Sequence, residues 1–97
     1  MEVKKSSAYC RYYADNATTL LKSKRVKTDA KNSYYFYDSL GIIYVISPFN
    51  FPFWLCFKPV IPTLLLGNAV LHRPSDSTPL VGLGLEELFK EAGFDTF

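Results

Sequence analysis

A chain of 97 residues, 48% of them hydrophobic and 16% aromatic, fits one small domain and is too apolar for a disordered segment. The net charge of +2 is divided unevenly, since residues 1–31 carry eight basic and three acidic side chains and residues 32–97 carry three and six. Two cysteines 46 positions apart and one histidine exclude a disulfide framework and a zinc site, so we predict no bound metal and two free thiols in a reducing cytoplasm.

The first third of the chain predicts a helix, a polar loop and a short strand. Residues 5–22 place Tyr9, Tyr13 and Ala17 at the spacing of an amphipathic helix. The run KSKRVKTDAK (22–31) could bind phosphate or nucleic acid. Because aromatic residues are not interleaved with it, we interpret it as a solvated helix end and loop and expect no nucleic-acid partner. The aromatic segment SYYFYD (33–38) then favours a strand.

The next segments predict a strand, a helix and a second strand. The β-branched run IIYVIS (42–47) is typical of a strand that is covered on both faces of a parallel sheet. The segment PFWLCFKPVIPTLLL (52–66) is long and apolar enough for a buried helix, and its internal Pro59 and Pro62 predict a bend or a division into two parts. A Gly-Asn pair ends this helix, and AVLHR (69–73) follows as a short buried strand.

The last predicted element is a helix that begins at Pro79. Thr78 can cap its N-terminus, and Val81, Leu85 and Leu88 form an apolar stripe. The complete order is helix, strand, strand, helix, strand, helix, an α/β arrangement that we predict to be part of a Rossmann-like, doubly wound unit. Two or three strands do not form a sheet with two covered faces, so the chain is expected to be a fragment of a larger domain.

The turn SPFNFPFW (47–54) is the most unusual segment, because the amide of Asn50 stands among two prolines, three phenylalanines and a tryptophan. The prolines stop any strand or helix from passing through, so we predict that Asn50 lies on a rigid turn and away from bulk water. Residues 40–57 carry no charge and are nominally long enough to span a bilayer. The prolines would free backbone groups in lipid, so we expect no membrane span and keep a membrane-associated hairpin as an alternative.

Three blocks in order resemble the N-terminal cofactor-binding region of the aldehyde dehydrogenase superfamily: ISPFNFPFW (46–54), IPTLLLGNAVLHRPSDSTPL (61–80) and LEELFKEAGF (85–94). The upstream RYYADNA and VKTDAKNSY are most similar to the succinate-semialdehyde dehydrogenase-like branch. The resemblance implies that residues 1–97 are a partial NAD(P)-binding domain, truncated before the catalytic domain. It also implies an oxidoreductase that converts an aldehyde, with succinate semialdehyde as the candidate, to a carboxylic acid with NAD or NADP. Its partners would be the remainder of the enzyme or the subunits of a homo-oligomer.

The resemblance also assigns roles to the matching residues. Asn50 matches the amide that donates a hydrogen bond to the oxyanion formed when a cysteine thiolate attacks the aldehyde. One such donor is worth about 3–4 kcal/mol in acyl-transfer enzymes. The implied cofactor-binding residues lie where the two strands end: Ile46, Ser47, Pro48 and Phe49 along the nicotinamide half, and Arg73, Ser75 and Asp76 near the adenosine ribose.

Three of these matches differ from the family pattern. Phe49 replaces a tryptophan, Arg73 a lysine and Asp76 a glutamate, and the shorter Asp76 could loosen the grip on the ribose or make room for a 2′-phosphate. The family's nucleophilic cysteine and general-base glutamate match no residue here, so activity of the isolated chain is not expected. The alternatives are a non-catalytic, degenerate remnant or interaction module, and a small membrane-associated protein.

Overall fold

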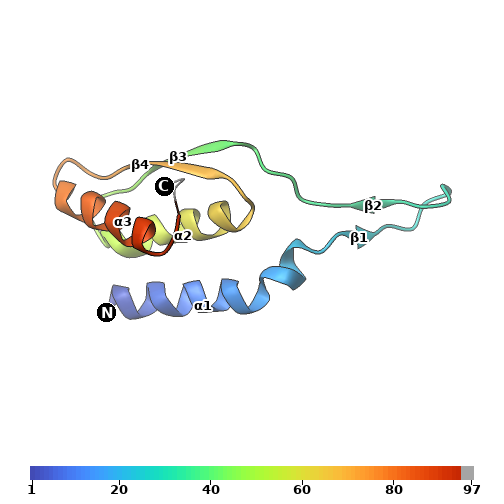
Figure 1. Cartoon of the computed structure of the whole chain (residues 1–97), viewed down its shortest axis with the longest axis horizontal. Coiled ribbons are helices and arrows are strands. Elements are labelled where there is room, and N and C mark those ends of the chain that lie inside the picture. The colour runs from blue at the N-terminus through green and yellow to red at the C-terminus, as the bar shows by residue number, and fades with distance from the viewer. Residues whose placement is uncertain (95–97) are drawn as a thin grey trace.

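The structure, a computed structural model, describes residues 1–94 and folds them into three helices and four strands (Figure 1). The predicted α/β class is confirmed, and one short strand is added to the predicted order. The elements are α1 (Glu2–Leu21), β1 (Lys24–Arg25), β2 (Tyr34–Tyr35), β3 (Ile42–Ile46), α2 (Pro52–Leu65), β4 (Ala69–Arg73) and α3 (Pro79–Glu91).

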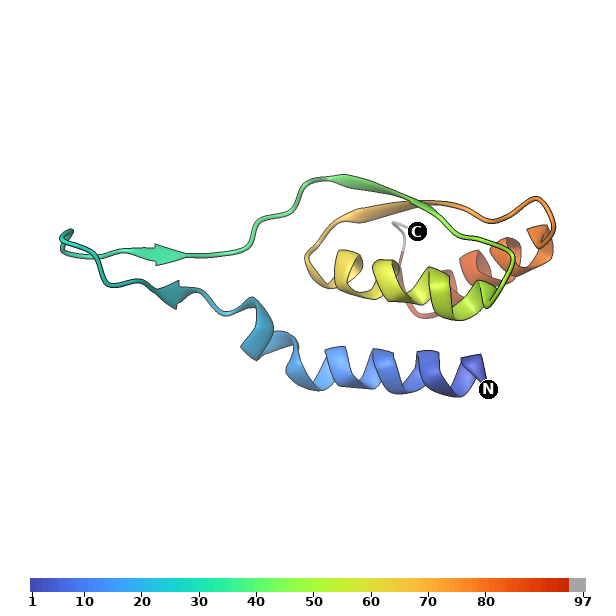
Figure 2. The ribbon, with the colours of Figure 1, turned by 180° about the vertical axis from the view of Figure 1, so that it is seen from behind.

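A β3–α2–β4 crossover forms the body of the molecule. The two strands pair in parallel, with Ile42 opposite Ala69 and Ile46 opposite Arg73. Parallel neighbours cannot be joined by a tight turn, and α2 is the connection that this pairing requires. Figures 1 and 2 show α2 and α3 beneath the ribbon of the two strands, with α1 beyond α2. The carboxyl ends of β3 and β4 therefore meet at one edge of the sheet.

The core lies between the inner face of this sheet and the two helices that follow its strands. It is made of Val45, Cys56, Phe57, Val60, Val70, Leu85 and Phe89. The outer face of the sheet is open among the described residues, since Ile42 is 73% and Ile46 65% exposed. The β-branched pattern predicted a sheet that is covered on both faces. Residues 1–94 cover only one face of it.

Helix α1 packs along α2 and supplies a hydrogen-bond donor that one of the prolines of α2 lacks. Pro62 has no N–H to donate to the carbonyl of Lys58, and the hydroxyl of Tyr9 donates to that oxygen instead, at 3.0 Å. Burial raises the pKa of Tyr9 to about 12, so the hydroxyl keeps the proton that it donates. Of the two predicted alternatives, the division into two parts is wrong, because α2 is a single helix from Pro52 to Leu65, and the bend stays a prediction.

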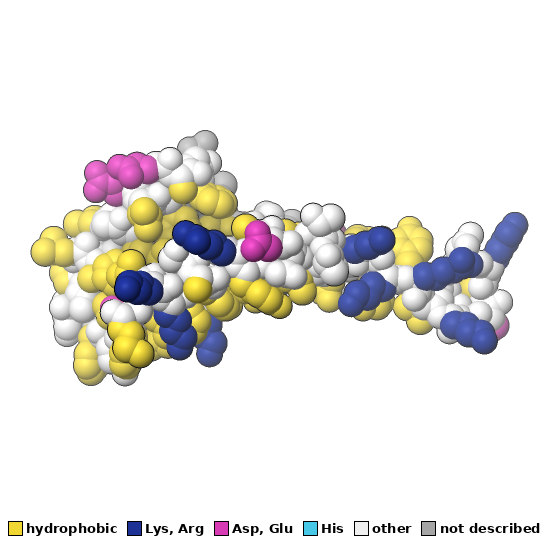
Figure 3. Space-filling view, turned by 90° about the horizontal axis from the view of Figure 1, so that it is seen from below, with side chains coloured by type: hydrophobic (Ala, Val, Ile, Leu, Met, Phe, Trp, Pro, Cys, Tyr) yellow, Lys and Arg dark blue, Asp and Glu magenta, His cyan; other side chains and the backbone are white. Residues whose placement is uncertain are grey.

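Residues 22–40, here called the arm, project from the body (Figures 1 and 3). The interpretation of residues 22–31 as helix end and loop is partly wrong, because Lys24 pairs with Tyr35 and Arg25 with Tyr34 in an antiparallel ladder. The predicted strand 33–38 shrinks to two residues. Its aromatic side chains are exposed, Tyr34 by 66%, and Tyr34 and Tyr35 lie opposite the basic residues of β1 in the ladder.

Candidate functional site

The structure brings the two predicted groups of cofactor-binding residues together. An open hollow of about 310 Å³ lies at the carboxyl ends of β3 and β4. This is the edge at which open α/β sheets bind their ligands. Its lining consists of all seven predicted residues together with Pro74: Ile46, Ser47, Pro48, Phe49, Arg73, Pro74, Ser75 and Asp76.

Ser47 fixes the β3 side of this hollow. It is 4% exposed, and its N–H donates to the carbonyl of Arg73 at 3.1 Å, which extends the ladder one residue past the end of β3. Its hydroxyl forms a hydrogen bond with the imidazole Nε2 of His72 at 2.8 Å. Burial lowers the pKa of His72, which keeps this ring neutral at pH 7. The wall of the hollow is therefore anchored by both backbone and side-chain bonds.

Arg73 and Asp76 form the polar side of the hollow. Their Nη2 and Oδ1 atoms are 3.7 Å apart, and the side chains are 60% and 93% exposed. An ion pair in such contact with water contributes little to stability, so a ligand can recruit either group at small cost. Ser75 belongs to a tight loop, in which its carbonyl accepts from the N–H of Thr78 at 2.9 Å.

Asn50 lies on the turn that joins β3 to α2, directly after Phe49. The prediction that it is shielded from bulk water is wrong for this chain, because its side chain is exposed. The rigidity of the turn stays a prediction, and no described residue hydrogen-bonds to the amide. The next residue, Phe51, has φ +51° and is the only non-glycine residue with positive φ in the described part of the chain. The turn thus holds a free amide donor next to the hollow on a strained backbone.

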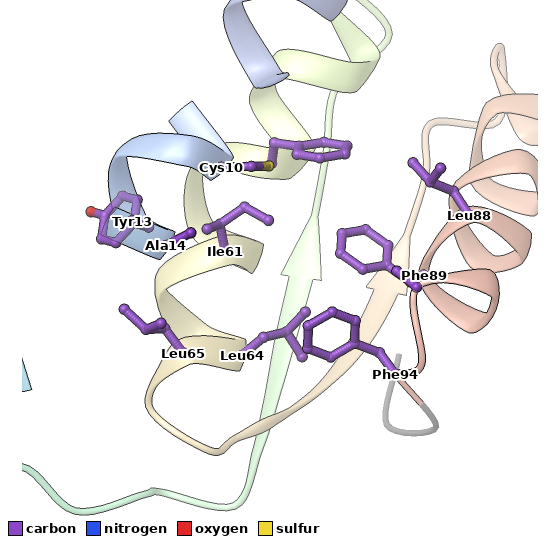
Figure 4. Close-up of a pocket in the computed structure, with 11 residues that line it drawn as sticks. Cys10, Tyr13, Ala14, Ile61, Leu64, Leu65, Leu88, Phe89 and Phe94 are labelled. Carbon is purple, nitrogen blue, oxygen red and sulfur yellow. The ribbon is translucent and has the colours of Figure 1, made fainter. Parts of the chain in front are cut away.

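A larger, apolar hollow of about 550 Å³ lies between the three helices (Figure 4). Ile61, Leu64 and Phe89 point into it, and the thiol of Cys10 lies in its wall. Burial raises the pKa of Cys10 and raises that of the buried Cys56 to about 12, so neither is an activated nucleophile. This hollow offers packing surface without reactive groups.

Within residues 1–94, no cluster of three or more histidine, cysteine, aspartate or glutamate side chains could hold a metal ion. The same residues contain no helix with the length and apolar content that a membrane span requires. The two cysteines are free thiols.

Sequence reasoning gave Asn68 only the role of a helix stop. Its side chain is in fact a buried connector, 5% exposed, at the start of both strands. The oxygen Oδ1 accepts from the N–H groups of Leu40 and Gly41 at 2.6 and 3.0 Å, and Nδ2 donates to the carbonyl of Thr63 at 3.1 Å. A polar side chain between an apolar helix and an apolar strand is the signal that could have revealed this role.

The parallel crossover is that of a partial Rossmann-like α/β unit, and the hollow at its strand ends lies at the edge where such sheets bind ligands. The model of the aldehyde dehydrogenase family matches residues 1–96, and the chain therefore belongs to that family.

The relatives agree with this assignment. The chain is 41% identical over 93 residues to the probable succinate-semialdehyde dehydrogenase (NADP+) of Synechocystis sp., covering 96% of this chain and 20% of that protein. The NADP+ complex of succinic semialdehyde dehydrogenase from Streptococcus pyogenes superposes with a TM-score of 0.83 and 33% identity, over 88% of this chain and 19% of that one. The NADP complex of NADP-dependent glyceraldehyde-3-phosphate dehydrogenase from Bacillus halodurans superposes with a TM-score of 0.81 and 30% identity. The match covers 96% of this chain and 21% of that one. The chain thus spans about a fifth of the length of the curated relatives it matches.

Proposed function

We propose that residues 1–97 form part of the cofactor-binding domain of an NADP-dependent aldehyde dehydrogenase and supply the oxyanion donor Asn50. The observation that carries this proposal is the shared hollow: residues 46–49 and 73–76, far apart in the chain, line one cavity beside the turn that bears Asn50. The cavity of about 310 Å³ is at the lower limit for small-molecule pockets and suits part of a dinucleotide. The chain would contribute one side of a cleft that other residues of the enzyme complete.

The cofactor proposal is NADP in preference to NAD. Its support is the NADP in the names and complexes of the relatives, together with the charge at the hollow. Arg73 is exposed, and its planar guanidinium can bind a phosphate with two parallel hydrogen bonds. Asp76 is one methylene shorter than the family's glutamate, which leaves room for a 2′-phosphate at the ribose. NAD, which lacks this phosphate, would not make these two hydrogen bonds with Arg73.

The role proposed for Asn50 follows from its chemistry and its position. An amide N–H stabilises a developing oxyanion without transferring a proton, and it acts best when its position is fixed before the reaction. Pro48, Pro52 and the strained Phe51 fix the backbone on both sides of Asn50. The bound cofactor would accept the hydride, and the nucleophile and general base would come from parts of the enzyme that these residues do not match.

The substrate proposal is succinate semialdehyde, oxidised to the carboxylic acid. It is supported by the names of the relatives from Synechocystis and Mycobacterium ulcerans. We further propose that the exposed outer face of the sheet is covered in the assembled enzyme, either by its remaining residues or by another subunit. The β-branched pattern of β3 and the exposure of Ile42 and Ile46 support this.

A chimera tests the proposal. The 93 aligned residues of this chain replace the matching segment of the Synechocystis relative, and NADP-dependent oxidation of succinate semialdehyde is measured. Activity is expected, and Asn50→Ala should lower kcat about 10²–10³-fold, the usual cost of one oxyanion donor. Asn16→Ala is the matched control, because that amide bonds only to the carbonyl of Tyr12 within its own helix. A folded, active chimera in which Asn50→Ala keeps full kcat would refute the role of Asn50.

A non-catalytic interaction module is the second candidate. The observation that favours it is the amount of exposed apolar surface, with Tyr34 and Phe36 on the arm and Ile42 on the sheet. A folded chimera that neither binds NADP nor oxidises aldehydes, combined with self-association of the 97-residue chain in sedimentation experiments, would support this candidate over the dehydrogenase.

A further inference from the structure

The N-terminus of α2 is capped by a residue from a different helix. The first N–H groups of a helix have no partner within it, and a side chain just before the helix usually accepts from them. Here the preceding residue is Phe51, whose ring cannot accept, and the side-chain cap is missing. The N–H of Trp54 instead donates to the carboxylate oxygen Oε2 of Glu2, on α1, at 3.1 Å. A carboxylate at this end also suits the positive end of the helix dipole.

The same face of α1 makes two further contacts with α2. The ammonium of Lys5 lies 4.0 Å from the centroid of the Trp54 ring, and the hydroxyl of Tyr9 donates to the carbonyl of Lys58. Glu2, Lys5 and Tyr9 follow one another at intervals of three and four residues, which places them on one side of the helix. Helix α1 therefore holds the first two turns of α2 at three points.

The segment between β3 and α2 is short, and the structure fixes both of its ends. At one end Ser47 is bonded to the carbonyl of Arg73 and to the ring of His72. At the other end the strained Phe51 leads directly into the first turn of α2, where Glu2 accepts from Trp54. A left-handed backbone at a residue with a side chain is strained and persists where the surroundings impose it.

We propose that Glu2 is a positioning residue for the turn that carries Phe49 and Asn50. By holding the start of α2, Glu2 maintains the positive φ of Phe51 and thereby the direction of the two preceding side chains. The functional part of this inference rests on the function proposed above for Asn50 and the hollow. The conformational part stands on the contacts of Glu2 alone.

The test uses the 97-residue chain and compares Glu2→Ala, Glu2→Gln and Lys4→Ala by NMR and by NADP titration. Glu2→Ala should shift the Trp54 amide signal and raise the dissociation constant of NADP about fivefold. It should also change the φ-dependent backbone coupling constant of Phe51 from the value of a positive φ to that of a negative φ. A fivefold rise corresponds to a competent turn in about a fifth of the molecules. Glu2→Gln keeps an oxygen that can accept and should retain the wild-type value of all three readouts. Lys4→Ala, two residues after Glu2 and exposed, should change none of them.

Several outcomes overturn the proposal. If Glu2→Ala lowers only the melting temperature and leaves the Phe51 coupling unchanged, Glu2 acts in helix packing alone. If Glu2→Ala fails to fold, hydrogen exchange of the wild-type chain decides, since a Trp54 amide that exchanges as fast as an exposed one contradicts the cap. The chimera decides the proposed function, so if the wild-type chain alone does not bind NADP, the Phe51 coupling decides the role of Glu2.

Discussion

Replacing Asn68 by alanine tests whether one buried amide connects the starts of β3 and β4. The side chain makes three hydrogen bonds, two to the N–H groups of Leu40 and Gly41 and one to the carbonyl of Thr63. Each bond contributes about 1 kcal/mol net, and the groups left behind are shielded from full hydration. We therefore expect Asn68→Ala to lower the free energy of unfolding by about 3 kcal/mol, a large share of the 5–15 kcal/mol typical of a domain.

The assay is a circular dichroism melt, checked by urea unfolding. For a chain of this size, about 3 kcal/mol corresponds to a fall in Tm of about 12–24 °C. Asn50→Ala is the matched control, because its exposed amide has no partner among the described residues and the change should stay within about 0.5 kcal/mol. A fall of less than about 4 °C for Asn68→Ala would show that water replaces the lost bonds and would refute the reasoning.

Three further predictions concern packing and protonation. Gly82→Ala should destabilise by about 1–3 kcal/mol in urea unfolding, because its Cβ would lie 2.6 Å from Cγ of Pro74, whereas Gly84→Ala, with open space, should stabilise α3 by about 0.5–1 kcal/mol. Tyr9→Phe should cost about 1 kcal/mol by the same method, since the Lys58 carbonyl loses its donor, and Tyr12→Phe, on the exposed side, should cost less. Burial lowers the pKa of His72, so the unfolded chain binds a proton more readily and stability should fall as the pH drops through about 6.5; His72→Gln should flatten this part of the Tm profile, and an unchanged profile would assign the effect to other groups.

Much of the fold could be predicted because its signals are local. The strand prediction 69–73 agrees with β4, and the predictions 42–47 and 52–66 each extend one residue beyond β3 and α2. In these segments the apolar pattern and the Gly-Asn stop act within a few residues. The errors occur where contacts with a distant segment of the chain determine the local structure. Lys24 and Arg25 form a strand only because Tyr34 and Tyr35 pair with them, and α2 stays in one piece because Tyr9 replaces a donor that the local sequence lacks.

The predicted stripe of α3 is confirmed at Val81 and Leu85 and is wrong at Leu88, for a related reason. Spacing alone allowed Leu88 to face the core, yet it is 48% exposed and the next residue, Phe89, is 4% exposed. Phe89 stacks with Phe57 of α2, with ring centroids 5.5 Å apart, and this large contact sets the rotation of the helix. Helical periodicity predicts the buried face of a helix to within one residue. Contacts with the neighbouring helix decide which of two adjacent residues is buried.

The candidate site divides in the same way. Its chemistry could be predicted because residues 46–50 and 73–76 form compact motifs in which an amide, a guanidinium and a carboxylate stand next to strand ends. Its support could not be predicted, since the oxygen that caps Trp54 lies 52 residues away in Glu2, and the donor that completes Lys58 lies 49 residues away in Tyr9. Short motifs predict which groups can contact a ligand, whereas the hydrogen bonds that hold the neighbouring backbone in place join distant segments. The proposed role of Glu2 makes the geometry of the turn that carries Asn50 depend on α1, which shares no motif with it.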